Sequence, residues 1–341
     1  MSLNKRLINT GAIINYDSVA YVVAYTADSL TSFDISNPNS MVELNSYIDS
    51  TNLNGAFDIA LDLANNVAYV SSVISNTITA FDISNPASLS VLSVFTNANI
   101  NYPDSIQLDL VNQVAYVVNA NNFKIVSIDI SNPSSMAFLS FFTNSNLVGA
   151  WQLSLDLVNQ VAYVVCNYWG GMFVAVDISN PSSMSELSSI SAPDFRAVAV
   201  DSVNDVAYIS TGGNVVSINI SNPSSMVQIG SISSVNLNRV DDIKLDVSNN
   251  VAYFVSYAAG GIVSFNISNP SSVVELDALL NLTNMNGAHG LALDLTNNIA
   301  YVKAGTSESI TSIDISNPSS MVELDSYTSA NLKDFGAVEI S

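Results

Sequence analysis

An aspartate that follows Leu or Val recurs along the sequence. The two residues that stand five and four positions before it differ in chemistry from one copy to the next. The pairs are Phe57-Asp58, Asp104-Ser105, Trp151-Gln152, Arg196-Ala197, Asp241-Asp242 and His289-Gly290, and alignment of the C-terminal segment adds Val338-Glu339. Such side chains could bind a ligand, hold a metal ion or transfer protons. The candidate site residues are Asp58, Asp104, Trp151, Gln152, Arg196, Asp241, Asp242, His289 and Glu339.

The acidic members of this set could bind a divalent cation, because carboxylate oxygens are the ligands that calcium prefers. They are Asp58, Asp104, Asp241, Asp242 and Glu339. The sequence contains no contiguous calcium-binding loop. No cofactor is therefore predicted, and calcium remains the alternative.

The other candidates leave more than one interpretation open. His289 is the only histidine, which excludes a histidine-rich metal site and leaves either a polar rim residue or a general base. Arg196 could hold an anionic ligand, or it could pair with Asp241 or Asp242 of a neighbouring repeat. Trp151 could stack on a sugar or on a partner's side chain, or it could fill the core.

Two short markers show that these positions belong to a sequence repeat. The tripeptide Ser-Asn-Pro recurs at 36–38, 84–86, 131–133, 179–181, 221–223, 268–270 and 316–318. The dipeptide Ala-Tyr recurs at 20–21, 68–69, 115–116, 162–163, 207–208, 252–253 and 300–301. Because the two markers keep a fixed phase, the chain consists of seven copies of a unit of about 47 residues.

Each unit contains four short β segments, judged from alternation and from β-branched or aromatic content. In the second unit they are 58–63, 67–72, 78–83 and 89–95, which we call A, B, C and D. The C–D turn is Ser84-Asn85-Pro86, where proline fixes φ and cannot donate to a strand ladder.

Seven four-stranded antiparallel units predict an all-β fold, a single seven-bladed β-propeller over residues 1–341. The C-terminal segment 336–341 matches 55–60, the start of an A strand, and no B strand follows it. Residues 19–24 supply a B strand. We therefore predict that the C-terminal strand pairs with the N-terminal blade and covers an open edge.

The run Ala-Tyr-Val, a short loop that often contains Gly-Gly, and then Ile-Asp-Ile-Ser-Asn-Pro-Ser-Ser closely resembles the LVIVD-repeat family of β-propellers. The resemblance extends from about Ala20 to Ser341. It departs where the family has a second proline, because several copies carry a methionine there: Met41, Met136, Met184, Met226 and Met321. The resemblance implies a surface or extracellular protein and implies the fold more strongly than an activity.

The composition limits the classes of partner. Eight Lys and Arg stand against 29 Asp and Glu, so the formal charge of −21 disfavours nucleic acid and anionic membranes. The single cysteine, Cys166, excludes an internal disulfide framework. No apolar run approaches membrane-spanning length, so no membrane insertion is expected.

Comparison of the copies indicates which face of the disc could act. In an antiparallel blade the A–B and C–D turns lie on one face, called here the turn face; the B–C and D–A connections lie on the other, called here the mouth face. The turns are nearly identical in every copy, whereas the B–C loops and the starts of the A strands differ. Variable loops on a rigid scaffold are typical of recognition.

Two functions from different classes fit this pattern. The favoured one is a non-catalytic binding or structural module on an extracellular or particle surface, which engages a protein or glycan through the mouth face. The alternative is a metal-dependent, lactonase-like hydrolase that uses the acidic rim for a metal and His289 as a base. The sequence does not define the ligand, the compartment or the oligomeric state.

Overall fold

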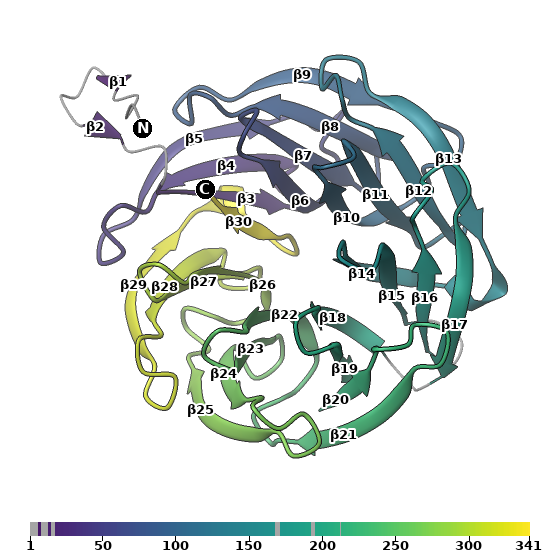
Figure 1. Ribbon diagram of the computed structural model, residues 1–341. Helices are drawn as coiled ribbons and strands as arrows, with labels where there is room; N and C mark the ends of the chain where they lie inside the picture. Colours follow the sequence, from purple (N-terminus) through teal and green to yellow (C-terminus); the bar gives the residue numbers. More distant parts are fainter. Residues whose placement is uncertain (1–5, 8–12, 15–17, 168–170, 192–194, 212) are drawn as a thin grey trace.

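Seven four-stranded antiparallel sheets stand around a central axis in the computed structural model (Figure 1). The structure describes residues 6–7, 13–14, 18–167, 171–191, 195–211 and 213–341. The varied B–C loop at 167–172 therefore lies partly outside the described residues. The repeat and the fold class predicted from the sequence are confirmed.

The strands of each blade run from the axis outward in the order A, B, C, D. Blade 1 contains β30 (Val338–Ile340), β3 (Val19–Ala24), β4 (Ser29–Asp34) and β5 (Val42–Ile48). Blade 2 contains β6 (Ala56–Asp62), β7 (Val67–Ser72), β8 (Thr77–Asp82) and β9 (Ser90–Phe95). Blade 3 contains β10 (Pro103–Asp109), β11 (Val114–Asn119), β12 (Lys124–Asp129) and β13 (Ala137–Thr143). Blade 4 contains β14 (Ala150–Asp156), β15 (Val161–Cys166), β16 (Met172–Asp177) and β17 (Ser185–Ser191).

The remaining blades repeat this pattern. Blade 5 contains β18 (Phe195–Asp201), β19 (Val206–Thr211), β20 (Asn214–Asn219) and β21 (Val227–Ser233). Blade 6 contains β22 (Val240–Asp246), β23 (Val251–Ser256), β24 (Gly261–Asn266) and β25 (Val274–Leu280). Blade 7 contains β26 (Ala288–Asp294), β27 (Ile299–Ala304), β28 (Ser309–Asp314) and β29 (Val322–Thr328). A separate hairpin joins β1 (Arg6–Leu7) to β2 (Ile13–Ile14), and single 3₁₀ turns occupy η1 (Ser145–Leu147) and η2 (Ala330–Leu332).

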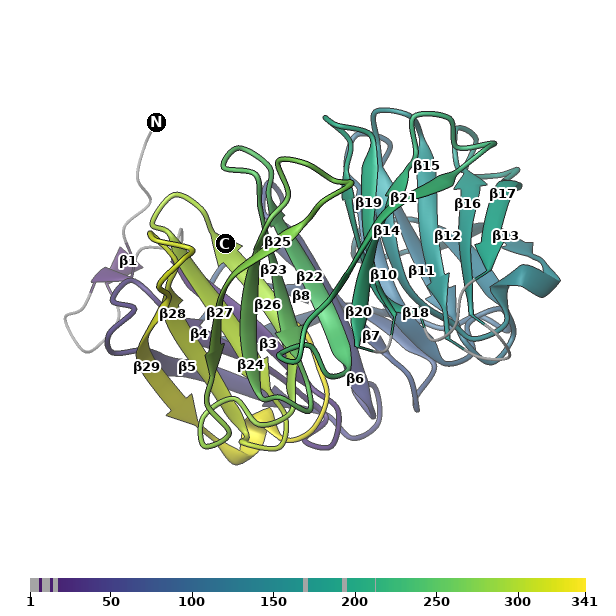
Figure 2. The ribbon, with the colours of Figure 1, turned by 90° about the horizontal axis from the view of Figure 1, so that it is seen from below.

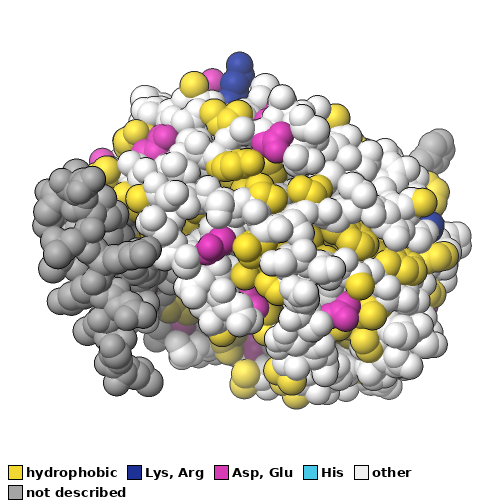
Figure 3. All heavy atoms as spheres, turned by 90° about the horizontal axis from the view of Figure 1, so that it is seen from above, with side chains coloured by type: hydrophobic (Ala, Val, Ile, Leu, Met, Phe, Trp, Pro, Cys, Tyr) yellow, Lys and Arg dark blue, Asp and Glu magenta, His cyan; other side chains and the backbone are white. Residues whose placement is uncertain are grey.

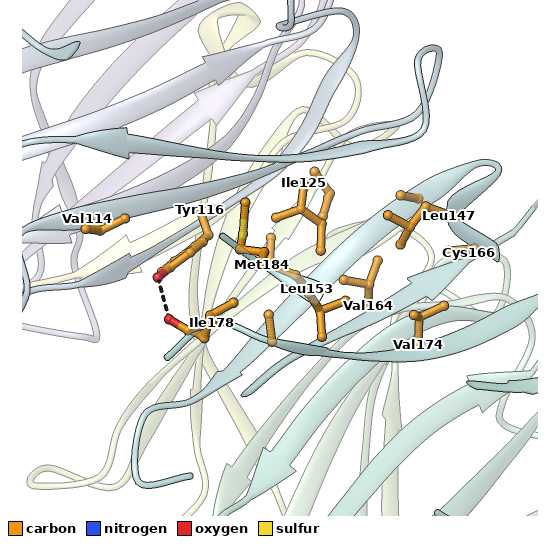
Figure 4. Packing of buried hydrophobic residues seen from close by; sticks show 14 residues of the cluster. Val114, Tyr116, Ile125, Leu147, Leu153, Val164, Cys166, Val174, Ile178 and Met184 are labelled. Carbon is orange, nitrogen blue, oxygen red and sulfur yellow. Dashed lines mark hydrogen bonds between the residues drawn. The ribbon is translucent and has the colours of Figure 1, made fainter. Parts of the chain in front are cut away.

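The hydrophobic core lies between blades, because the B and C strands are buried on both faces. The tyrosine of each Ala-Tyr pair belongs to a buried cluster with residues of the following blade. Tyr116 shares its cluster with Leu153, Val164 and Met184, and Figure 4 shows it beside Met184. Its hydroxyl donates to the Ile178 carbonyl across the blade boundary at 3.3 Å. The methionine that replaces the family's second proline is thus part of this packing in blade 4.

The turn face is stabilised by an aspartate cap in each of the six blades whose A and B strands are consecutive in the chain. In the A–B turn of blade 2, the Asp62 carboxylate accepts from the backbone N–H of Asn65 at 3.1 Å and from its side-chain amide at 2.7 Å. Asn66 then takes the left-handed conformation, with φ of 55°, which asparagine tolerates. The corresponding aspartates Asp109, Asp156, Asp201, Asp246 and Asp294 cap their own turns in the same way.

A serine hydroxyl links each Ser-Asn-Pro turn to the preceding blade. Ser127 of blade 3, for example, donates to the Pro181 carbonyl of blade 4 at 2.6 Å. The complete series is Ser32 to Pro86, Ser93 to Pro133, Ser127 to Pro181, Ser188 to Pro223, Ser217 to Pro270, Ser264 to Pro318 and Ser312 to Pro38. We call these bonds the Ser–Pro links, and they run around the whole ring.

Two of the Ser–Pro links have a different origin on the blade. In blade 2 the C strand carries Ala80 where other blades carry serine, and Ser93 of the D strand, directly opposite Ala80, donates instead. In blade 4, Ser188 opposite Ala175 replaces the C-strand donor in the same way. The bond is therefore kept even where the donor residue moves to the neighbouring strand.

The ring closes as the sequence predicts, by pairing β30 with β3 (Figure 1, yellow beside purple). The register of this pair corrects one prediction. Glu339 lies opposite Tyr21, as Ala60 lies opposite Tyr69 in blade 2, so Glu339 sits deeper in the channel than Asp58. The sequence alignment was therefore displaced by two residues at Glu339. The register shift in β6, which the β30–β3 pair lacks, accounts for one of them, and the alignment of Gly336 with Gly55 accounts for the other, because Phe335 takes the place of Gly55.

Seen from the side, the blades run between two clearly separated faces (Figure 2). The outer edge shown in Figure 3 is mostly uncharged, with scattered hydrophobic groups and few charged side chains. Within the described residues, no helix is long and apolar enough to cross a membrane.

Candidate functional site

A β-bulge near the start of each of six A strands turns one residue out of the ladder. In blade 2, Ala56 pairs with Ser72 and Asp58 with Ser71, which leaves Phe57 without a partner residue. The bulged residues are Phe57, Asp104, Trp151, Asp241 and His289, and in blade 5 the shift spans Arg196 and Ala197. Because a bulge redirects a side chain, these strands deliver chemically different groups to the channel mouth.

These groups surround a small cavity of about 40 Å³ at the mouth. Seven of the nine candidate residues line it: Asp58, Asp104, Trp151, Gln152, Asp241, Asp242 and His289. Phe57, Ser105, Gly290 and Ala337 complete the wall. The structure therefore brings these seven residues together around one cavity, and their role in ligand binding stays a prediction.

Three of the lining residues join neighbouring A strands. Asp58 accepts the backbone N–H of Ile106 in blade 3 at 2.9 Å, and Asp242 accepts that of Leu291 in blade 7 at 3.0 Å. The Gln152 side-chain oxygen accepts the N–H of Val198 in blade 5 at 2.7 Å. Each of these side chains thus links two blades: Asp58 links blades 2 and 3, Gln152 links blades 4 and 5, and Asp242 links blades 6 and 7.

Asp241 and His289 form the second part of the mouth. The Asp241 carboxylate is bound by the Nε of Arg239 at 3.0 Å, and its Oδ2 lies 3.9 Å from Nε2 of His289. Burial lowers the pKa of His289 to about 3, helped by the nearby charges of Lys303, Arg239 and Arg196. Burial also raises the pKa of Asp241 to about 6, so His289 is neutral beside a carboxyl that titrates near neutrality.

Asp104 stands apart from these pairs. The residue is 1% exposed, and neither carboxylate oxygen has a hydrogen-bond partner. Burial raises its pKa well above the usual value. An unpartnered carboxyl group at a cavity is costly for the fold, which indicates that the group serves something other than stability.

Aromatic rings cover the mouth. Phe57 meets Trp151 and His289 edge-to-face, each at a centroid distance of 5.5 Å. His289 also contacts Phe335 at 5.0 Å, and the Arg239 guanidinium lies over Tyr257 at 4.0 Å. Trp151 is thus packed on one side and partly exposed on the other, which combines the two sequence interpretations of this residue.

Sequence reasoning missed four residues of the mouth region: Arg239, Tyr257, Lys303 and Phe335. Lys303 carried the clearest signal, because it replaces a valine or serine that follows Ala-Tyr by two positions in the other copies. It is fully buried, its Nζ has no partner, and burial lowers its pKa to about 7. The other three lie outside the aligned positions of the repeat.

The remaining two candidates lie elsewhere around the channel. Arg196 comes from the bulge of blade 5, and its charge acts on both Asp241 and His289. Glu339 lies deeper and forms an ion pair with Lys244 of blade 6 at 2.8 Å. Two cavities of about 260 Å³ each lie further along the channel, one lined partly by Glu339 and the other by Lys244.

The acidic residues do not assemble as a metal site in the part of the chain that the structure describes. No group of three or more His, Cys, Asp or Glu side chains there is arranged to hold a metal ion. Asp58 and Asp242 each accept two backbone N–H groups, one from the next blade and one from their own following residue. These bonds occupy oxygens that a calcium ion would need.

The sequence matches the model of the LVIVD repeat at residues 19–49, 60–96, 111–143, 160–191, 198–234 and 293–329. These segments cover more than half of the chain, and the chain therefore belongs to the LVIVD-repeat family. The matched segments do not include blade 6, which contributes Asp241 and Asp242 to the mouth. No curated protein sequence matches the chain.

Solved structures with the same architecture span almost the whole chain. A protein from Lactobacillus plantarum has a TM-score of 0.79 at 12% identity and covers 94% of this chain and 98% of its own. The periplasmic gluconolactonase of Pseudomonas aeruginosa has a TM-score of 0.77 at 10% identity, covering 95% and 99%. A functionally unknown protein from Desulfotomaculum acetoxidans has a TM-score of 0.75 at 12% identity, covering 95% and 99%. At these identities the similarity shows the fold alone.

Proposed function

We propose that this LVIVD-repeat protein is a non-catalytic binding module whose mouth face engages a protein or glycan partner around the channel cavity. One observation carries the proposal: six bulged A strands present five different types of side chain at one position, while the turn face repeats the same Ser–Pro link in all seven blades. Aromatic and arginine side chains dominate recognition energy at many interfaces. Trp151 lines the cavity, Arg239 pairs with Asp241 beside it, and the charge of Arg196 acts on Asp241.

The hydrolase alternative has weaker support. The gluconolactonase named above resembles this chain at 10% identity, which is too low to carry over an activity. Two of the acids that a metal-dependent reaction would need, Asp58 and Asp242, hold neighbouring blades together. A binding function therefore explains the positions of more of the mouth residues than a hydrolase function does.

A pair of double variants tests the proposal. Glycan and peptide arrays are probed with the native protein, with Trp151→Ala plus Arg196→Ala, and with Pro133→Ala plus Pro181→Ala as a matched change on the turn face. We expect the mouth variant to lose array binding and to melt within a few degrees of the native protein. The turn variant should keep its ligands and melt slightly lower, because alanine adds freedom to the unfolded chain.

The reverse pattern would contradict the proposal. Ligands that survive the mouth substitutions and disappear with the turn substitutions would move the binding surface to the turn face. The melting curves separate this result from a variant that simply fails to fold.

A further inference from the structure

The mouth cavity presents hydrogen-bond acceptors that nothing in the protein satisfies. The buried lining atoms without a hydrogen-bond partner are both carboxylate oxygens of Asp104 and Nε2 of His289. Oδ2 of Asp241 faces the same space and lies 3.0 Å from Nε of Arg239. The two aspartates are 1% and 3% exposed, and His289 is 7% exposed. Since buried polar atoms are nearly always paired, this group indicates an absent hydrogen-bond donor.

The charge of the lining favours a cationic donor. Asp58, Asp104, Asp241 and Asp242 line the cavity, and the described lining contains no Lys or Arg. Outside this lining, Arg239 pairs with Asp241 at 3.0 Å, which leaves Asp58, Asp104 and Asp242 as the other acids of the lining. Burial, together with the charges of Lys303, Arg239 and Arg196, lowers the pKa of His289 to about 3 and keeps the imidazole neutral. The Gly336 carbonyl favours a proton on the other ring nitrogen, which leaves Nε2 of His289 as an acceptor.

The shape and walls of the cavity favour an organic cation over a metal ion. Phe57 and Trp151 form part of the wall, and aromatic rings attract ammonium groups through their π faces. Oδ2 of Asp241 and Nε2 of His289 are 3.9 Å apart, so one nitrogen could donate to both at ordinary hydrogen-bond length.

We propose that the cavity binds a primary ammonium group on an alkyl stem, and that a lysine side chain of a partner protein supplies it. This inference rests on the proposed binding function and names the group that the mouth face recognises. The ammonium would donate to Asp241 and His289 from blades 6 and 7 and would be balanced by Asp104 from blade 3. The stem would lie against Trp151, which is partly exposed beside the cavity.

The fluorescence of Trp151 provides a direct measurement. The chain has two tryptophans, so Trp169→Phe leaves Trp151 as the only one. This variant is titrated at constant ionic strength with n-butylammonium chloride and with Nα-acetyl-lysine amide. We expect both amines to change the emission in a saturable way, whereas 1-butanol, which has the stem without the charge, leaves it unchanged.

Isosteric variants identify the recognising groups. Asp241→Asn and Asp104→Asn, each in the Trp169→Phe background, should weaken amine binding at least tenfold. Asp314→Asn, at an exposed C–D turn, is the matched control and should bind as the parent does. Thermal melts establish whether each variant is folded. If one of the two aspartate variants does not fold, the other still tests the proposal.

Several outcomes would overturn the inference. A flat response to both amines, or an equal response to sodium butyrate or calcium chloride, contradicts an ammonium site. The same holds if array ligands need the mouth residues and yet bind equally after their lysines are acetylated. Binding that does not depend on acetylation would contradict the ammonium site and leave the proposed function unaffected. Array ligands that bind the mouth variant as well as the native protein would contradict the proposed function itself.

Discussion

The turn face and the mouth face are built from the same repeat and use it in opposite ways. On the turn face, each Ser–Pro link and each aspartate cap satisfies a buried polar group, and each recurs in blade after blade. On the mouth face, Asp104, His289 and Lys303 keep buried polar atoms without partners. The contrast teaches that the repeated contacts of the turn face contribute to stability, whereas the buried polar groups of the mouth face occur where the copies differ.

Removal of the closing strand should produce the largest effect. Deletion of residues 336–341 takes β30 from blade 1 and leaves β3 as an unpaired inner edge between blades 7 and 2. We expect the melting temperature to fall by about 10 °C or more, because exposed edges lose both hydrogen bonds and packing. Calorimetry of the truncated and full chains measures this. An unchanged melt would mean that ring closure does not depend on β30.

Replacement of the buried lysine should stabilise the protein. The pKa of Lys303 is lowered by burial to about 7 in the folded state, against 10.5 when exposed. The unfolded chain therefore holds the proton more tightly, and the cost to folding is full below pH 7 and disappears toward pH 10.5. Lys303→Met should raise the melting temperature by several degrees at pH 6 and by much less at pH 10.

The control for this prediction is Lys333→Met, which changes an exposed lysine close in the sequence. Its melting difference from the native protein should be small at both pH values. A gain at Lys303→Met that stays constant from pH 6 to pH 10 would show that shape, and not charge, limits the site.

Asp104→Asn should stabilise the protein with the opposite pH dependence. Burial raises the pKa of Asp104 above 3.8, so the folded state binds the proton more tightly than the unfolded chain does. Its cost to folding is absent below pH 3.8 and grows as the pH rises toward the raised pKa. Urea denaturation should show a gain of about 1 to 3 kcal/mol at pH 8 and almost none at pH 4.

Loss of one Ser–Pro link should give the smallest effect. Ser127→Ala removes the hydroxyl that binds the Pro181 carbonyl, and we expect a loss of about 1 kcal/mol, or about 2 °C in melting temperature. In blade 4 the exchange Ala175→Ser plus Ser188→Ala moves the donor to the C strand, where five other blades carry it. This exchange should be neutral, whereas Ser188→Ala alone should cost as much as Ser127→Ala.

Most of the fold could be predicted from the sequence because its signals are local and are repeated seven times. Turn residues such as Asn66 and Pro86, and the alternation of each strand, define a blade within one unit. The Ser–Pro links could not be predicted, because donor and acceptor lie in different units and the donor changes strand in two of them.

The sequence predicted where most residues of the candidate site lie, and it predicted only part of the contacts that their side chains make. The recurrent Asp fixes the register of each A strand, so the ring of Phe57, Trp151 and His289 could be counted from it. Asp58 and Asp242 accept backbone N–H groups from neighbouring blades. These bonds could not be predicted, because they depend on how two blades pack together and not on the sequence of one repeat. Glu339 was misplaced by two residues: the bulge of β6, which leaves no mark in the sequence, changes the count by one, and Phe335 rather than Gly336 corresponds to Gly55.

The pairing of β30 with β3 also sets an order of events during synthesis of the chain. Blade 1 begins with residues 19–48, yet its inner strand is made only after six further blades. Domains fold as the chain emerges, so a growing chain carries an incomplete first blade, with an open strand edge, until residues 338–340 have been made. The final residues of β30 thus act as the last step of assembly, and a chain that stalls before residue 338 exposes the edge that most invites pairing with another molecule.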